Sequence, residues 1–167
     1  MSVPAAIMAA LDALPHPAMR EAGFAALRAS WDEESAAWAA EVWPRLEALM
    51  TEKDNHLRAI GGQAVAALAR QVPADRERAT LPGLILLTFD ARFVTARHVI
   101  QRLWKLGLHP DPAFRREVRM AMSQLWRDAA GEKNAPWYAR SAGGSAPALR
   151  SIGRGGGQRP RPRIDPA

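Results

Sequence analysis

A pattern of residues recurs in this chain at an interval of 38 positions, and this period limits the fold more than any other feature of the sequence. Two stretches share the pattern, WPRLEALMTEKDNHLRAIGGQAVAAL (43–68) and LPGLILLTFDARFVTARHVIQRLWKL (81–106). A period of this length is typical of proteins built from stacked units of two helices. The corresponding positions, 38 residues apart, are Pro44 and Pro82, Leu46 and Leu84, Leu49 and Leu87, and Glu52 and Asp90.

The second half of the pattern continues with one inserted residue. Leu57-Arg58, Gly61 and Val65 correspond to Ala96-Arg97, Ile100 and Trp104, 39 positions later. A weaker copy precedes them, since Met19-Arg20, Gly23 and Leu27 lie 38 positions before the first set. We therefore expect three copies of a helix pair, and a final helix that covers the open end. The copies span about residues 4–30, 35–69 and 77–106, and the final helix about 112–129.

The segments between the breakers have helical rather than strand periodicity. Apolar residues recur at Val3, Ile7, Leu11 and Leu14, three or four positions apart. Asp111-Pro112 is a typical helix start, because Pro fits the first helical position and Asp caps the turn. No stretch of useful length alternates like a strand, so we predict an all-α fold.

The pattern P-x-L-x-x-L, followed by an acidic residue and an apolar-Arg pair, resembles the HEAT repeat of the HEAT/armadillo superfamily. The first copy departs from it, because it lacks the Pro and has Leu14 in place of the acid. The resemblance implies a short right-handed α-solenoid of about three helix pairs plus a C-terminal covering helix. Stacked neighbours would supply the core that one pair cannot form alone.

The resemblance also implies a ladder of hydrogen bonds between successive copies, formed by Glu52 and Asp90 with Arg20, Arg58 and Arg97. The cluster of Asp90, Thr95, Arg97 and His98 looks at first like an active site. Its polar positions recur in other copies, however, and one active site does not need several copies. We interpret Asp90 and Arg97 as structural and His98 as an ordinary helix residue.

Charge separates the chain into a body, 1–138, and a tail, 139–167. The tail has six Arg and one Asp among many Gly, Pro and Ser residues, so we expect it to be disordered. The body has a small excess of positive charge, which gathers toward its end. The residues of this candidate surface for nucleic acid or another partner are Arg92, Arg102, Lys105, Arg115, Arg116 and Arg119. If they share one concave surface, nucleic acid is favoured; if they are dispersed, a protein partner is.

Other chemistry has little support in the sequence. There is no cysteine, the four His residues are scattered, and no nucleotide-binding or nucleophile motif occurs. We therefore predict no catalytic, cofactor-binding or metal-binding residues. Trp31, Trp38 and Trp43 fit either the packing of the repeat or, beside acidic residues, a protein-binding surface.

We expect a cytoplasmic, non-catalytic binding module whose partner is another protein, with no membrane segment, no signal peptide and no cofactor. The alternative is a nucleic-acid-binding protein similar to the HEAT-like alkylpurine DNA glycosylases, using the basic C-terminal helices. A third hypothesis, a lyase-type chaperone or cofactor-handling HEAT protein, rests on fold analogy alone.

Overall fold

The fold is all-α, as predicted, in a computed structural model that describes residues 2–31 and 37–129. Those residues contain no strand. The predicted tail, 139–167, and the acidic residues Asp32, Glu33 and Glu34 lie outside the described residues. The α-helices are α1 (Ala5–Ala13), α2 (Arg20–Ala29), α3 (Ala39–Met50), α4 (Asn55–Leu68), α5 (Ala74–Leu87), α6 (Phe93–Leu103) and α7 (Pro112–Ala129). Short 3₁₀ helices, η1 (Ala69–Gln71) and η2 (Trp104–Leu108), follow α4 and α6.

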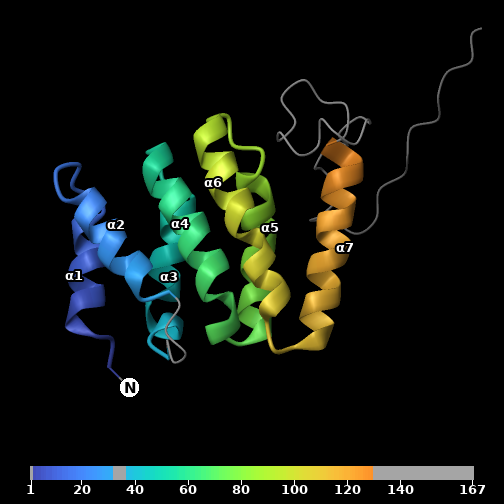
Figure 1. The fold of residues 1–167 in the computed structure, drawn as a ribbon, viewed down its shortest axis with the longest axis horizontal. Coiled ribbons are helices and arrows are strands. Elements are labelled where there is room, and N and C mark those ends of the chain that lie inside the picture. The colour runs from blue at the N-terminus through green and yellow to red at the C-terminus, as the bar shows by residue number, and fades with distance from the viewer. Residues whose placement is uncertain (1, 32–36, 130–167) are drawn as a thin grey trace, which may run out of the picture.

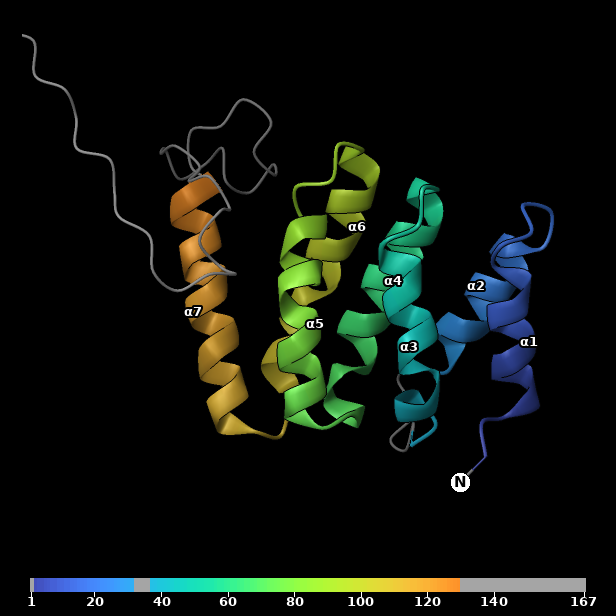
Figure 2. The ribbon, with the colours of Figure 1, turned by 180° about the vertical axis from the view of Figure 1, so that it is seen from behind.

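Successive pairs of helices stand side by side in a row, from α1 and α2 at one end to α7 at the other (Figure 1). Helices α2, α4 and α6 form one layer, and α1, α3 and α5 lie behind them (Figures 1 and 2). Contacts join α4 to α6 in the first layer, and α3 to α5 and α5 to α7 in the second. We call the surface of α2, α4 and α6 the second-helix face. No helix of the described residues is long and apolar enough to cross a membrane.

Glycines allow the two helices of a pair to approach closely at one repeated position. A Cβ on Gly23 would lie 2.7 Å from the carbonyl oxygen of Ala10 in α1. A Cβ on Gly61, the corresponding residue of the second copy, would lie 2.8 Å from the backbone nitrogen of Met50 in α3. Only a residue without a side chain fits such backbone contacts. The two glycines therefore mark the same crossing point in the first two copies.

An ion pair joins the second copy to the third. Arg58 Nε donates to Asp90 Oδ2 at 2.7 Å, and Arg58 Nη2 donates to Asp90 Oδ1 at 3.1 Å. Burial disfavours the Asp90 carboxylate, but hydrogen bonds from Arg58 and from the Arg92 backbone N–H hold its pKa below the usual value. The bidentate geometry fixes direction as well as distance between α4 and the turn before α6.

The same contact recurs one copy earlier, with a correction to the predicted acid. Arg20 pairs with Asp54 at 2.9 Å, whereas Glu52 has an exposed side chain. Asp54 takes the acidic position of the ladder because it caps α4, where its side chain accepts a hydrogen bond from His56 N–H. The Asp90 side chain accepts a hydrogen bond from Arg92 N–H in the same way. The 38-residue spacing pointed to Glu52 because the turns before α4 and α6 differ in length.

Glu52 contributes its backbone instead of its carboxylate. Arg58 Nη1 donates to the Glu52 carbonyl at 2.8 Å, and Arg20 Nε donates to the Leu14 carbonyl at 2.9 Å. Both carbonyls lie six residues before the Arg. Because every residue has a backbone carbonyl, Leu14 accepts this hydrogen bond from Arg20 in the first copy without an acidic side chain.

The third Arg of the predicted ladder, Arg97, is exposed. No ion pair joins it to any side chain that the structure describes. The ladder therefore has two rungs within the described residues, Arg20–Asp54 and Arg58–Asp90.

The first helices are tied together through a proline. Pro44 lies inside α3 and has no N–H to donate to the carbonyl of Ala40, four residues earlier. Arg76 of α5 takes that acceptor, with Nη1 2.5 Å from the Ala40 oxygen. The proline of one copy thus creates a binding position for an arginine of the next.

Trp31, Trp38 and Trp43 are buried, so the packing interpretation is correct and the exposed-anchor alternative is wrong for these side chains. Helix α4 lies at the centre of the core, with nearly every residue from Leu57 to Leu68 buried. A fully buried central helix explains the run of small and apolar residues in its sequence.

Replacing Arg58 by Ala is predicted to lower the free energy of unfolding by about 2–4 kcal/mol, because it leaves the Asp90 carboxylate, 6% exposed, without its partner. Arg45→Ala is the matched control, since its pair with Asp12 is exposed and contributes less than about 1 kcal/mol. Urea unfolding of both variants measures the difference. Equal losses would show that the ladder pair contributes no more than a surface pair.

Candidate functional site

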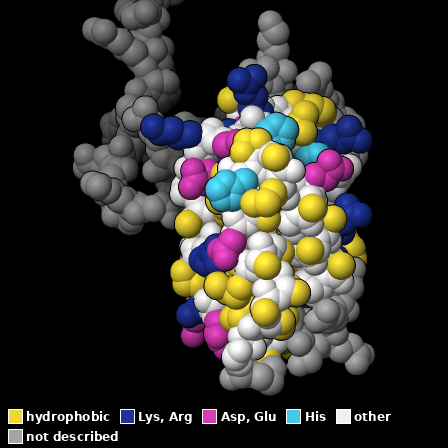
Figure 3. Space-filling model, turned by 90° about the vertical axis from the view of Figure 1, so that its left-hand side faces the viewer, with side chains coloured by type: hydrophobic (Ala, Val, Ile, Leu, Met, Phe, Trp, Pro, Cys, Tyr) yellow, Lys and Arg dark blue, Asp and Glu magenta, His cyan; other side chains and the backbone are white. Residues whose placement is uncertain are grey.

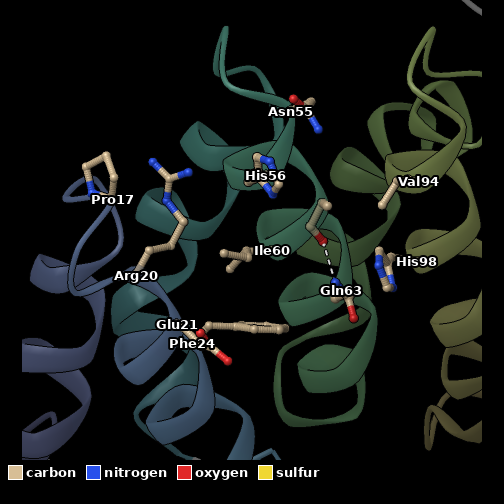
Figure 4. Close-up of a pocket in the computed structure, with 11 residues that line it drawn as sticks. Pro17, Arg20, Glu21, Phe24, Asn55, His56, Ile60, Gln63, Val94 and His98 are labelled. Atoms are coloured by element: carbon tan, nitrogen blue, oxygen red, sulfur yellow. Dashed lines mark hydrogen bonds between the residues drawn. The ribbon is translucent and has the colours of Figure 1, made fainter.

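A pocket of about 360 Å³ opens on the second-helix face, between α2, α4 and α6 (Figure 4). Helix α4 forms its floor, and α2 and α6 form its two walls. The lining residues are Pro17, Arg20, Glu21, Phe24, Asn55, His56, Ala59, Ile60, Gln63, Val94 and His98. The size is in the range of ordinary ligand pockets and matches one or two bulky side chains of a bound peptide.

The walls and floor of the pocket are largely apolar. Phe24 reaches from α2 toward α4, Ile60 lies on α4, and Val94 projects from α6 (Figure 4). Phe24 also contacts the buried Trp31 edge to face, with ring centroids 5.7 Å apart, which holds its ring in place. The pocket therefore offers a preformed apolar surface.

Polar and charged side chains also line the pocket, namely Arg20, Glu21, Asn55, His56, Gln63 and His98. The Gln63 side-chain amide donates to the Ala59 carbonyl at 3.1 Å, which fixes its orientation. Burial, with the nearby charges of Arg97 and Arg102, lowers the pKa of His98, so its imidazole is neutral at pH 7. A neutral imidazole has one donor and one acceptor. The pocket can thus hydrogen-bond a neutral polar group beside an apolar one.

The sequence analysis missed this pocket, although the repeat carries a signal for it. The residue after each Arg of the ladder pattern lines the pocket: Glu21 after Arg20, Ala59 after Arg58, and His98 after Arg97. Successive residues of a helix point about 100° apart, so the neighbour of a ladder Arg faces the adjacent groove. His98, interpreted as an ordinary helix residue, is therefore a wall of the pocket.

The six basic residues of the candidate surface are dispersed. Arg92 precedes α6, whereas Arg102 lies in its last turn with its guanidinium 5.5 Å from the centre of the Trp31 ring. Lys105 lies in η2, with Nζ 5.8 Å from the Trp104 ring. Residues at opposite ends of one helix, such as Arg92 and Arg102, do not form a single phosphate-binding surface.

The remaining three basic residues belong to α7, at the far end of the row from α1. Arg115 stabilises the turn before α7, donating to the carbonyls of His109 at 2.7 Å and Pro110 at 2.9 Å. Arg116 and Arg119 are exposed. Arg115 therefore has a local structural role, and only two of the three extend into solvent.

The other end of the row exposes many apolar side chains. Yellow side chains cover much of this end of the molecule (Figure 3). Its exposed residues on α1 include Ala5, Ala6, Met8 and Ala9. Methyl groups of Ala provide contact area but no hydrogen bonds, so this surface has fewer means of selecting a ligand than the pocket.

A buried carboxyl group lies in the α3–α5 contact. Glu77 is 0% exposed, and neither of its oxygens has a hydrogen-bond partner. Nearby, Trp43 Nε1 donates to the Thr80 hydroxyl at 3.2 Å, and that hydroxyl donates to Glu47. Burial, and secondly the charge of Glu47, raise the pKa of Glu77 to about 8. Glu77 is therefore mostly protonated at neutral pH.

No group of three or more His, Asp or Glu side chains in the described part of the chain could hold a metal ion. His109 is buried and acts within the fold, with Nε2 3.1 Å from the Val72 carbonyl and Nδ1 accepting from Asp111 N–H. Glu21, His56 and His98 line the same pocket but do not form such a group.

Comparisons with known proteins found no match: no protein-family model, no curated protein and no solved structure is similar to this chain at a significant level.

Glu77→Gln is predicted to change how stability depends on pH. The pKa of Glu77 is above its unfolded value, so the native state loses stability as pH rises from about 4.5 to about 8. The ionised carboxylate destabilises the native state by up to about 5 kcal/mol above that range. The variant should melt at a higher temperature than the wild type at pH 9 and close to it at pH 5.

Thermal melts across this pH range measure the effect. Glu41→Gln, at an exposed position of α3, is the control and should leave the pH dependence unchanged. A Glu77→Gln variant that follows the wild-type curve at every pH would show that Glu77 does not titrate in the native state.

Proposed function

We propose that this chain is a non-catalytic, HEAT-like α-solenoid module that binds a segment of another protein on its second-helix face. The pocket between α2, α4 and α6 is the observation that carries the proposal. Protein-binding sites are centred on pockets that receive a few apolar anchor side chains, with polar groups around them. Phe24, Ile60 and Val94 supply such a pocket here, and Gln63 and His98 supply the hydrogen bonds.

The arrangement of charge supports a protein partner over nucleic acid. Phosphate binding relies on cations gathered along one surface, and its strength falls steeply with salt. Arg102 stacks on Trp31, Arg115 binds backbone carbonyls, and Arg92 lies at the opposite end of α6 from Arg102. The glycosylase-like alternative therefore has less support from the geometry than the pocket gives to peptide binding.

The rigidity of the face also supports this function. The Arg20–Asp54 and Arg58–Asp90 pairs connect α2 to the start of α4 and α4 to the start of α6. A partner that docks between these helices meets walls already held in position, so little conformational entropy is lost on binding.

The test uses two exposed aliphatic residues of nearly equal exposure. Val94, 53% exposed, lines the pocket, whereas Leu86, 54% exposed, lies on α5 in the other layer. Peptides are selected from a random phage-displayed library on the wild-type protein, and their affinities for a Val94→Glu and a Leu86→Glu variant are then measured. Val94→Glu is predicted to weaken binding at least about tenfold, because it places a charge in the apolar wall, and Leu86→Glu to leave it unchanged.

Circular dichroism verifies that both variants stay folded. Equal binding by the two variants, or equal loss in both, would contradict the assignment of the pocket as the binding site. If the selected peptides bind equally well whether or not Val94 is replaced, their binding interface lies elsewhere on the molecule.

A further inference from the structure

A cation lies at one end of the pocket on the second-helix face. Arg102 follows His98, a residue of the pocket lining, by one turn of α6. Its guanidinium is 5.5 Å from the centre of the Trp31 ring. The ring of Phe24, which lines the pocket from α2, is 5.7 Å from the same Trp31 ring. Arg102 therefore joins the α6 wall to the α2 wall, at what we call the C-terminal end of the pocket.

The charge of Arg102 has no acidic partner in the described part of the chain. Other arginines there form ion pairs with Asp or Glu, but none of these pairs includes Arg102. Helix α6 itself contains no Asp or Glu. Glu21, the acid that lines the pocket, lies in the first turn of α2, whereas Trp31 follows the end of that helix. No described carboxylate therefore pairs with the positive charge at the C-terminal end of the pocket.

The contact with Trp31 leaves Arg102 able to bind a carboxylate. A guanidinium that lies over an aromatic ring uses its flat face and directs its N–H groups outward in its own plane. Such a group can bind a carboxylate through two parallel hydrogen bonds, as Arg58 binds Asp90. Because Trp31 already holds the half-buried Arg102 side chain, little of its conformational entropy is lost when a ligand binds.

We propose that Arg102 binds the side-chain carboxylate of an Asp or Glu in the bound segment, so that the partner of the second-helix face is an acidic peptide. The inference rests on the proposed function, because it names the partner of that same pocket. Arg102 is one helical turn, about 6 Å along the axis, beyond His98. An extended segment spans this distance with about two residues. The acidic residue is therefore expected about two positions from the apolar anchor that contacts Phe24, Ile60 and Val94.

The surroundings of Arg102 favour an acidic peptide over other charged ligands. Burial, and then the charges of Arg97 and Arg102, lower the pKa of His98. His98 therefore adds a hydrogen-bond donor to this wall and no second charge at neutral pH. One cation fits a single carboxylate, whereas a nucleic-acid strand requires several cations along its backbone. A basic segment would be repelled by Arg102.

The first test is the composition of peptides selected on the wild-type protein from a random phage-displayed library. The selected sequences are expected to contain Asp or Glu beside a large apolar residue more often than the unselected library does. A selected set without this enrichment would overturn the inference.

The second test is a double-mutant cycle between protein and peptide. A selected peptide with blocked termini, and a form of it with Asn or Gln in place of the acid, are measured against the wild type and Arg102→Gln. Each single change is predicted to weaken binding about tenfold, and the two together little more, because both remove the same contact. Arg119→Gln, at an exposed position of α7, is the matched control and should bind both peptides as the wild type does.

The outcomes separate this inference from the proposed function. Losses that multiply in the cycle would mean that Arg102 acts only on the shape of the walls. With binding that still depends on Val94, that result overturns the acidic partner and leaves the proposed function intact. If no selected peptide depends on Val94, the proposed function fails and this inference fails with it. Displacement of the peptide by an equal concentration of a short oligothymidylate would also overturn the inference, because the site would then bind phosphates.

Discussion

The ion pair between Arg58 and Asp90 is the contact on which the arrangement of the helices depends. Apolar packing brings α4 and α6 together but tolerates sliding and rotation, whereas two parallel N–H···O bonds, at 2.7 and 3.1 Å, do not. A buried ion pair adds little net stability, because desolvation offsets most of the attraction. Its main effect here is therefore on geometry, and its loss is costly because a charge is left buried.

The pocket on the second-helix face follows from this geometry. Arg20 pairs with Asp54, the N-cap of α4, and Arg58 pairs with Asp90 in the turn before α6. These two pairs hold α2, α4 and α6 at a fixed spacing at the end where the pocket opens. Arg102 packs over Trp31 and joins α6 to the end of α2. The walls of the pocket are thus set by polar contacts between copies, and the residues beside the ladder Arg are free to define what binds.

The helices and their period could be predicted from the sequence, because proline positions, apolar spacing and the recurring Arg are local features. The acid of the first rung could not, since whether Glu52 or Asp54 meets Arg20 depends on the length of the turn. Glu77 was also missed, because an acidic residue in the first turn of a helix is ordinary and nothing local indicates its burial. The pocket depends on the distance between three helices, which no single segment encodes.

The most direct test of this account is a double-mutant cycle on Arg58→Ala and Asp90→Asn, measured by urea unfolding. The account predicts a coupling energy of about 1–3 kcal/mol between the two residues, because each loses its main partner when the other is removed. Additive effects, within about 0.5 kcal/mol, would contradict it. Such a result would mean that apolar packing alone sets the spacing of the copies.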